Sequence, residues 1–406
     1  MKIVKSSQRL LFIDHCRAFL VSLVVLDHAM HAYSEHYAKY WFLPDFDRSI
    51  FFDVLHLHND SFMMPSLFFL AGLFILPSLQ RRGYLDFLKE RALRLGVPFI
   101  IGVPLICPLL SYPKYKMYED PTIGYWEYVS TVFIDKPQAG PFWFLYYLSL
   151  LTITAIIVYA IFPKFYKGLG AFCRWFLKKP LYGFGIVFLA GAVMMGLSDL
   201  IWGAPWWIGF GKLFYVRASR FMLKTFLFFL GIGFSECGLL QNQLAWKNLS
   251  DHWKEWTLFA VTIGIIYISY SLLYFDAGAY NNGIRLYFHQ GGEWEGFWPV
   301  FGEFAPPVLT RTTLLTLFIL GQLMAYLAIF HRFMNHASPS WQSLAMASYG
   351  IYLIHEPFVV WTHSFFHGTD VPILIRFVIS GFGSLFISWA IVSHGLLKIP
   401  LFRRIL

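Results

Sequence analysis

The sequence predicts an all-α polytopic membrane protein with about ten transmembrane helices and both termini in the cytoplasm. Of its 406 residues, 57% are hydrophobic and only 14% are charged, and the mean hydropathy is +0.56. A soluble domain of this length cannot bury so much apolar surface. The apolar residues form stretches long enough to cross the hydrocarbon core of a bilayer, and Lys and Arg gather in alternate connections between them.

The apolar stretches are distributed along the whole chain. Each has about the 20 residues that a membrane span needs. They cover residues 11–33, 50–78, 95–112, 141–162, 181–201, 219–240, 256–275, 307–330, 343–366 and 372–396. No low-complexity segment, long linker or internal repeat separates them. We therefore expect residues 1–406 to form a single integral membrane domain, without a separate soluble domain.

The basic residues of the connections predict the orientation. They gather in the N-terminal tail, in the second-to-third and fourth-to-fifth connections and in the C-terminal tail, whereas the segment 276–304 has Arg285 against four acidic residues. By the positive-inside rule both termini are cytoplasmic, in a membrane that we expect to be a bacterial inner membrane. Orientation explains the net charge of +9 better than nucleic-acid binding, because the basic residues form no exposed stripe.

Three local patterns complete the topology. The basic N-terminus precedes an apolar run without a small-residue cleavage site, so we expect a retained first helix rather than a signal peptide. The cysteines include no CxxC pair, which argues against disulfides and a zinc site; they are Cys16, Cys107, Cys173 and Cys237. A Trp-rich loop between the fifth and sixth stretches has the residues of an interfacial anchor, namely Trp202, Trp206 and Trp207.

Arg17 and His28 are the most informative polar residues of the first stretch. Eleven residues at about 100° each return to within roughly 20° of the start, so both side chains lie on one helix face, about 16 Å apart along the axis. Such groups are costly in a membrane and mark functional sites. The orientation places Arg17 toward the cytoplasm and His28 in the outer half, with Asp27 beside it and His31 one turn further.

A second intramembrane histidine follows in the ninth stretch. His355 is expected at the depth of His28, and Pro357 is expected to kink the helix there and to free backbone carbonyls toward a cavity. The simpler alternative for either histidine is a hydrogen bond to a neighbouring helix.

Polar residues also open the second stretch. Asp53, His56 and Asp60 have spacings of three and four residues, so they lie on one helix face at the outer boundary. They could bind the hydroxyl groups of an acceptor, or they could simply form a solvated helix end.

Arg91 and Arg94 precede the third stretch at the cytoplasmic edge. One turn apart, their guanidinium groups suit a polyphosphate or an anionic headgroup. Ordinary positive-inside anchoring is the alternative.

Taken in order, these motifs resemble the acyltransferase-3 family of integral membrane acyltransferases. Arg17 and His28 match its pattern of an arginine, ten residues and a histidine, and Arg91 and Arg94 match its RxxR motif. Further similar segments are an apolar helix ending in a small-residue pair, a Trp-Phe-Leu segment and a late Tyr-Leu-x-His segment, at residues 62–72, 140–145 and 348–355. Residues 91–98 and 397–401 are most similar to the branch that includes the periplasmic glucan succinyltransferase, although Glu356 replaces a second histidine.

The resemblance implies O-acyl transfer from a cytoplasmic acyl-CoA, such as acetyl-CoA or succinyl-CoA, to an extracytoplasmic saccharide or glucan. Arg91 and Arg94 would bind the CoA phosphates, with Arg17 as a third cation. His28 would act as the general base or as a transient acyl carrier. His355 would stabilise the oxyanion or position the donor, and no metal is expected.

The remaining polar groups are candidates to orient His28 and to contact the acceptor. Asp27 points about 100° away from His28, so a carboxylate from another helix is a better candidate to orient that imidazole. Glu356 and Asp53 both qualify. The acceptor is expected to contact Asp53, His56, Asp60 and Glu356.

Two alternative functions use the same groups. A proton-coupled transporter would also place Arg, His and Asp within the membrane, but the RxxR motif and the lack of a repeat disfavour it. A metalloenzyme using His28, His31, His56 and His58 lacks an HExxH motif or a dense histidine box. A non-catalytic scaffold would not need polar groups at this depth.

Overall fold

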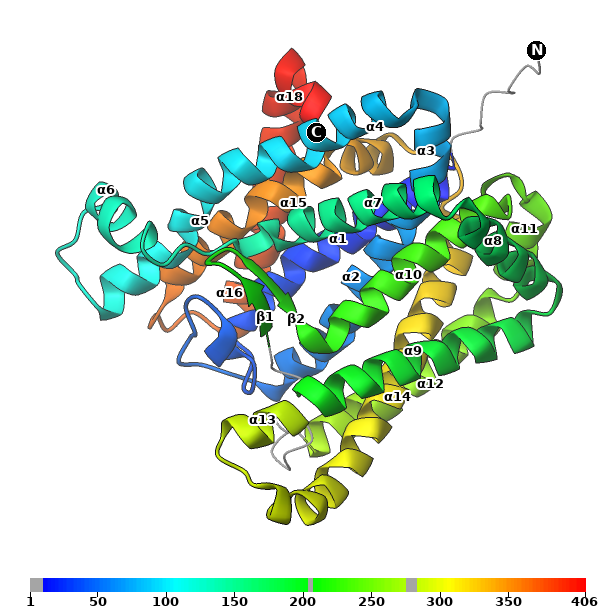
Figure 1. The fold of residues 1–406 in the computed structure, drawn as a ribbon. Coiled ribbons are helices and arrows are strands. Elements are labelled where there is room, and N and C mark those ends of the chain that lie inside the picture. The colour runs from blue at the N-terminus through cyan, green and yellow to red at the C-terminus, as the bar shows by residue number, and fades with distance from the viewer. Residues whose placement is uncertain (1–9, 204–206, 275–282) are drawn as a thin grey trace.

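The computed structural model describes residues 10–203, 207–274 and 283–406, and these are almost entirely helical (Figure 1). Each predicted stretch is mainly helical in its described part. The corresponding helices are α1 (Leu11–His31), α2 (Ile50–Leu73), α5 (Val97–Tyr118), α7 (Trp143–Ile161), α9 (Pro180–Trp202), α10 (Ala218–Glu236), α12 (Trp253–Leu273), α14 (Trp294–Phe333), α15 (Pro339–Phe366), and α16 (Ile373–Val378) followed by α17 (Ser384–Ala390).

Shorter elements connect the long helices. The helices are α3 (Ile75–Arg82), α4 (Tyr84–Arg91), α6 (Tyr125–Tyr128), α8 (Pro163–Lys178), α11 (Gln243–Asp251), α13 (Ile284–His289) and α18 (Pro400–Ile405). In the Trp-rich loop, β1 (Trp207–Phe210) pairs antiparallel with β2 (Phe214–Arg217), a hairpin that we did not predict. Trp206 lies outside the described residues, and Trp207 is exposed on the hairpin.

Eight of the described helical segments are long and apolar enough to cross a membrane. They include all the predicted stretches except those that became α1 and α15. These two helices have 21 and 28 residues, which is sufficient length, but both contain charged and polar side chains. The chain is therefore an all-α polytopic membrane protein, and the two expected spans outside this set of eight carry His28 and His355.

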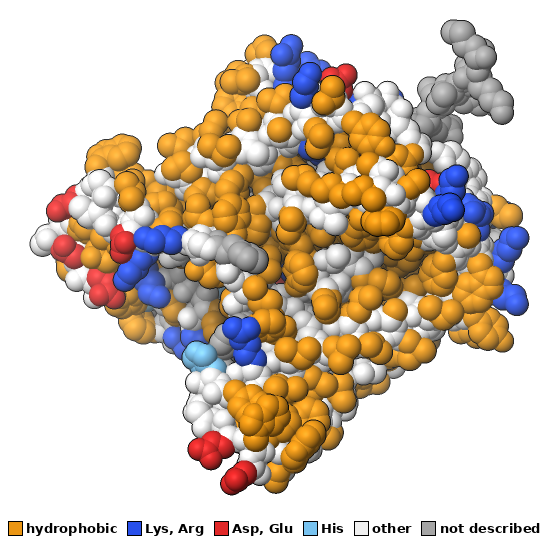
Figure 2. Space-filling view, viewed as in Figure 1, with side chains coloured by type: hydrophobic (Ala, Val, Ile, Leu, Met, Phe, Trp, Pro, Cys, Tyr) orange, Lys and Arg blue, Asp and Glu red, His pale blue; other side chains and the backbone are white. Residues whose placement is uncertain are grey.

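The short elements lie at two opposite ends of the helix bundle. In Figure 1, α3, α8 and α11 lie at the upper right, and α6, α13 and the β-hairpin lie at the opposite end. Figure 2 shows Lys and Arg at the top and right, whereas Asp and Glu gather at the left and bottom tips, with some Lys and Arg near the left tip. The exposed residues at these ends include Lys164 and Lys178 on α8, and Glu127, Glu293 and Glu295 near α6 and α13. This distribution supports the predicted orientation.

The centre of the bundle is a close contact between α2 and α10. A β-carbon at Gly72 would collide with the backbone carbonyl of Phe228, and one at Gly231 would collide with that of Phe69. Glycines at these positions let the two backbones touch, as small residues commonly do between membrane helices. α2 also packs along α1, where its polar start faces the histidines of α1.

The loop between α1 and α2 folds over the end of α1 that carries His28. Asp45 is 2% exposed and accepts hydrogen bonds of 2.8 Å from Arg376, which is 1% exposed. Asp53 is fully buried and accepts hydrogen bonds of 2.8 and 2.9 Å from the backbone N–H groups of Glu35 and His36. Two buried carboxylates therefore hold this loop against the bundle.

Candidate active site

α1 and α15 run in parallel and bring the two intramembrane histidines into contact. Near their first turns, the His15 ring packs against Trp341, and about four turns further along the Nδ1 atom of His28 lies 2.9 Å from the Nε2 atom of His355. The two imidazole rings stack with their centroids 5.1 Å apart. The His28 side chain is 21% exposed, whereas His355 is fully buried. The sequence correctly placed both residues at a similar depth.

The hydrogen bonds of His355 determine where the protons of this pair lie. Its Nδ1 atom is 2.9 Å from the carbonyl oxygen of Tyr352 and 3.2 Å from that of Ile351. Carbonyl oxygens only accept, so in the neutral ring Nδ1 carries the proton and Nε2 is the acceptor. His28 must then donate its Nδ1–H to His355, which leaves the lone pair of His28 on Nε2.

Glu356 is the second partner of His28. Its Oε1 atom lies 3.3 Å from the Nδ1 atom of His28, and the residue is 4% exposed. Its Oε2 atom is buried and has no hydrogen-bond partner among the described residues. Of the two carboxylates that the sequence offered as orienting groups, the structure brings Glu356 to His28 and places Asp53 in the loop contact described above. The geometry therefore favours a structural role for Asp53.

The Trp-Phe-Leu segment packs against the same part of α15. Tyr352 donates its hydroxyl hydrogen bond to the carbonyl oxygen of Pro141, and its ring lies 5.5 Å from that of Phe144. Gly140 has a φ of +45°, and a β-carbon there would lie 2.8 Å from a methyl carbon of Leu110. Only glycine fits this crowded left-handed position without strain, which fixes the start of α7 beside the active-site turn of α15.

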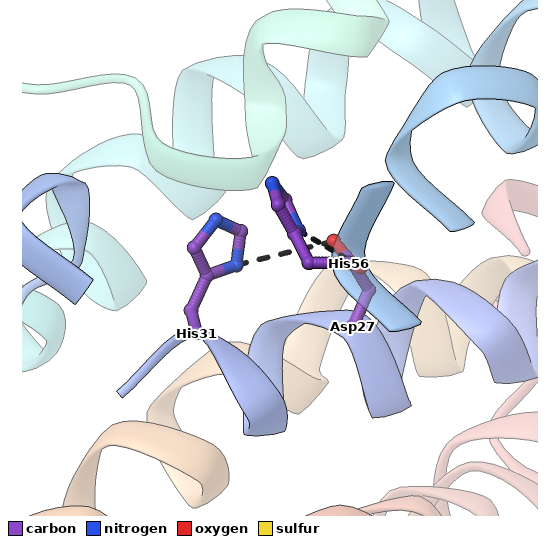
Figure 3. Close-up of side chains that lie close together, drawn as sticks. All are labelled: Asp27, His31 and His56. Carbon is purple, nitrogen blue, oxygen red and sulfur yellow. Dashed lines mark hydrogen bonds and ion pairs between the residues drawn. The ribbon is translucent and has the colours of Figure 1, made fainter. Parts of the chain in front are cut away.

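Asp27, His31 and His56 form a second polar cluster beside His28 (Figure 3). The Nδ1 atom of His56 lies 3.1 Å from one Asp27 oxygen, and the Nδ1 atom of His31 lies 3.9 Å from the other. Asp27 thus faces α2 rather than His28, as its position on the helix predicted. The sequence did not indicate that His56 would be its partner.

The three ligand atoms of this cluster lie within 4.8 Å of one another, so we tested whether they fit a metal ion. Two imidazoles on one tetrahedral zinc, with bonds of about 2.0 Å, hold their ring centres about 5 Å apart. The centroids of His31 and His56 are 4.1 Å apart, and the rings pack against each other at 60°. This geometry fits a packed polar cluster, in which His56 is hydrogen-bonded to Asp27, better than a metal centre.

Trp41 covers the site from the loop between α1 and α2. Its ring stacks on His31 at 5.2 Å and lies 5.4 Å from the His28 ring. Its indole N–H donates a 2.9 Å hydrogen bond to His363, whose other ring nitrogen lies 3.0 Å from the carbonyl oxygen of Ala29. Sequence reasoning missed Trp41 and His363, because neither residue belongs to a local motif near His28.

The RxxR motif lies where α4 passes into α5 through a π-helical turn, residues 92–96. The wider turn separates Arg91 and Arg94 around the helix more than the predicted α-helix would. The Arg91 guanidinium lies over the Phe87 ring at 5.0 Å, while Arg94 Nε lies 3.3 Å from Glu90, which also pairs with Arg82. The Nε atom of Arg91 is buried without a hydrogen-bond partner in the described part of the chain.

α15 connects this motif to the histidine pair. Tyr349 donates a hydrogen bond to the backbone carbonyl of Arg94, and His355 follows six residues later, about 9 Å along the helix. Arg17 lies on α1, 3.2 Å from Asp14, with 43% of its side chain exposed. Asp60 is hydrogen-bonded to Arg220 of α10, a partner that the sequence did not predict.

A family model described as an acyltransferase domain matches residues 10–393. The chain is also 29% identical over 161 residues to glucans biosynthesis protein C of Salmonella gallinarum, and 29% identical over 163 residues to the proteins of that name from Salmonella typhi and Salmonella typhimurium. Each match covers 38% of this chain and 40% of the length of the relative. No solved structure matches the chain. The chain therefore belongs to the acyltransferase-3 family of multi-pass membrane acyltransferases.

Proposed function

We propose that the protein transfers an acyl group from acyl-CoA to a hydroxyl group of an extracytoplasmic saccharide or glucan, with His28 as the general base. The observation that carries this proposal is the set of contacts around His28. Its Nδ1–H is held by His355 at 2.9 Å and by Glu356 at 3.3 Å, while its ring is 21% exposed. An imidazole held in one tautomer, with its other nitrogen bearing a lone pair, is suited to accept a proton.

The proposed transfer begins with deprotonation of the acceptor hydroxyl and ends with release of CoA. The Nε2 atom of His28 takes the proton of the acceptor hydroxyl as its oxygen attacks the thioester carbonyl carbon. The carbon–sulfur bond breaks, and the CoA thiolate recovers the proton from the imidazolium. Glu356 supports this cycle because its carboxylate, close to Nδ1, stabilises the positive charge that His28 acquires.

His355 has a positioning role in this proposal. Its Nδ1–H is bonded to backbone carbonyls and its Nε2 accepts from His28, so it has no proton left for an oxyanion. The same contact argues for His28 as base, because His355 fixes the tautomer that the base needs.

The donor would enter from the end of the bundle that carries the RxxR motif. Arg91 and Arg94 supply two guanidinium groups, which suit the phosphates of CoA. The buried and unpartnered Nε atom of Arg91 supports this assignment, as does the link from Arg94 through Tyr349 to α15. Arg17, on α1 toward the same end, is proposed as a further cation for the donor. By the positive-inside rule, this end faces the cytoplasm of a bacterial inner membrane.

The acceptor would reach His28 from the opposite end, beside Asp27, His31 and His56. This cluster offers carboxylate oxygen and imidazole nitrogen atoms, which bind hydroxyl groups well. The relatives named for glucan biosynthesis support a glucan as the acceptor. Asp60, 31% exposed at its side chain, is a further candidate contact.

Purified protein in lipid nanodiscs would test the proposal directly. Radiolabelled acetyl-CoA and succinyl-CoA are supplied with and without oligomeric glucans, and both free CoA and labelled glycan are measured. We expect glycan-dependent release of CoA, and we expect His28→Ala to lower the rate by about 10² to 10⁴-fold. His336→Ala, which removes an exposed histidine from the loop before α15, is the matched control and should retain full activity.

Three outcomes would contradict the proposal. Unchanged turnover in His28→Ala would exclude this residue as the base. Passage of an unmodified glycan or acyl compound across proteoliposomes, without CoA release, would favour the transporter. Release of CoA that does not depend on any glycan would exclude the saccharide as the acceptor.

A further inference from the structure

A cleft opens where α7, α8 and α10 meet, at the end of the bundle that carries the basic helix α8. Its volume is about 730 Å³, within the range of sites that hold small molecules. It is lined by Val158 and Ile161 of α7, by residues 162–165 at the turn into α8, and by Phe229 of α10. Among the residues that the structure describes, Lys164 has the only charged side chain in this lining. The cleft is therefore apolar and contains one cation.

The position of α7 places the cleft at the boundary of the membrane. α7 has 19 residues and is about 28 Å long, close to the hydrocarbon thickness of a bilayer. It ends at Ile161, and α8 begins two residues later at Pro163. In Figure 2, apolar side chains predominate over α7, and Lys and Arg gather beside α8 at the right. The apolar lining thus lies at the depth of lipid acyl chains, and Lys164 lies at the depth of the headgroups.

Contacts of α8 with both neighbouring helices hold the walls of the cleft in place. Tyr166 is fully buried and donates a 2.9 Å hydrogen bond to the backbone carbonyl of Ala155 on α7. Its ring lies 5.7 Å from that of Tyr159 and 6.5 Å from that of Phe229 on α10. Phe165 also contacts the Phe229 ring, at 6.3 Å. The cleft is therefore a fixed part of the fold, and a ligand need not reorganise it.

The opening of the cleft is apolar and faces away from the bundle. Ile161 and Phe162 are 62% and 63% exposed, although each belongs to the lining. An exposed apolar surface at the end of a membrane span is in contact with lipid rather than with water. The molecule that reaches this cleft therefore comes from the bilayer.

The charges around the cleft determine which lipid headgroup it fits. α8 carries four basic and no acidic residues, and Lys164 lies in its first turn. Glu236 of α10 packs beside Gly170 of α8, which is about 9 Å further along the helix than Lys164. An ammonium at the headgroup level attracts anionic lipids. This arrangement favours a headgroup with a net negative charge over a zwitterionic one.

We propose that the cleft binds one anionic phospholipid of the adjacent leaflet, with its phosphate at Lys164 and an acyl chain along Val158, Ile161 and Phe229. The lipid is a structural ligand, and its binding does not depend on the acyl transfer proposed above. It contacts α7, whose first turn follows the contact between Pro141 and Tyr352, and α10, which packs on α2. One bound lipid therefore joins two helices that position the active site.

Native mass spectrometry of the full chain in detergent tests the headgroup contact. Phosphatidylglycerol and phosphatidylcholine with identical acyl chains are titrated separately, and the dissociation constant of the first bound lipid is measured. We expect the wild type to bind phosphatidylglycerol about 5-fold more tightly, and Lys164→Met to remove this preference without weakening phosphatidylcholine. Lys178→Met, which removes an exposed lysine from the last turn of the same helix, is the matched control and should keep the preference.

A second variant tests whether the acyl chain lies in the cleft. Val158→Trp fills the apolar lining and leaves Lys164 in place, so it should weaken both lipids by about 10-fold through lost apolar contact. Thermal unfolding without added lipid verifies that each variant is folded.

Four outcomes would overturn the proposal. Equal affinity of the wild type for both lipids would exclude a headgroup site. Equal losses in Lys164→Met and Lys178→Met would assign the preference to the general charge of α8. Unchanged binding of both lipids to folded Val158→Trp would place the lipid elsewhere. Loss of CoA binding in Lys164→Met, with the lipid preference intact, would assign this lysine to a soluble phosphate ligand.

Discussion

Two helix pairs of this protein bury ionisable groups within the bundle, and they do so differently. In the pair α9–α14, Asp199 and Arg311 are 1% and 4% exposed and are bonded to each other. In the pair α1–α15, the His28 ring stays 21% exposed beside Glu356, which is 4% exposed.

The first arrangement stabilises the fold, and the second is suited to chemistry. A closed ion pair, with both side chains buried and bonded to each other, holds two helices together, since either partner alone would be a buried charge. A histidine that stays partly exposed, with a lone pair on its second ring nitrogen, can still accept and pass on protons. α9 keeps an apolar sequence apart from its polar end, whereas α1 and α15 are too polar to qualify as membrane spans by composition.

Of the substitutions that test this comparison, those in the closed pair Asp199–Arg311 should have the largest effect on stability. Asp199→Ala leaves Arg311 without this partner and should reduce the free energy of unfolding by about 3 to 5 kcal/mol. Denaturation in nanodiscs measures the change, and the specific activity of the folded fraction should persist. The double variant Asp199→Leu with Arg311→Leu should recover most of the stability. A loss in the double variant as large as in the single one would show that the pair is not a closed unit.

Glu356 should show the opposite behaviour. Glu356→Ala removes the carboxylate beside His28 and is expected to lower kcat by about 10 to 100-fold, because the imidazolium loses its stabilising charge. Glu356→Gln keeps the shape and loses the charge, so it should reproduce most of this decrease. Steady-state kinetics with saturating acyl-CoA and thermal unfolding of the same samples distinguish this result from misfolding. A normal kcat in Glu356→Gln would assign Glu356 to packing.

The RxxR motif should affect substrate affinity rather than the chemical step. Arg91→Ala with Arg94→Ala is expected to raise the KM for acyl-CoA by about 10 to 100-fold while kcat stays similar, since each guanidinium contributes charged hydrogen bonds to phosphate. Arg403→Ala with Arg404→Ala, on exposed α18, is the control for general loss of basic charge. Equal KM values in both double variants would show that Arg91 and Arg94 anchor the protein in the membrane and do not bind acyl-CoA.

Trp41 should give the smallest change. Trp41→Phe keeps an aromatic ring near His28 and His31 but removes the hydrogen bond to His363, which should cost about 1 kcal/mol of stability. We expect kcat to fall by only a few-fold. Thermal unfolding and kinetics check the two values, and a larger loss of kcat than of stability would indicate that the loop contact controls the site.

Much of the fold could be predicted from the sequence, because spans in lipid must be helical and apolar. The ten stretches became helices, and the topology predicted that His28 and His355 lie at a similar depth. Helix geometry also predicted that Asp27 would face away from His28. These are consequences of local periodicity, which the sequence carries directly.

The remaining features depend on contacts between distant segments. Nothing near Asp27 indicates that His56 lies against it, and nothing near Asp45 indicates that Arg376 would bind it 331 residues later. Likewise, Asp53 has the spacing of a surface group, yet it is buried beneath a loop. The π-helical turn in the RxxR motif also has no signal in the residue pattern, since the three-residue spacing of Arg91 and Arg94 fits an ordinary helix equally well.

The hydrogen bonds of His355 have a consequence for the energetics of the cell membrane. From His28 the described chain of bonds passes to His355 and ends at the carbonyl oxygens of Ile351 and Tyr352, which have no proton to hand on. A proton taken up by His28 therefore finds no onward route along this path. Acid–base chemistry can take place deep in a bilayer here without opening a wire along which the proton gradient would discharge.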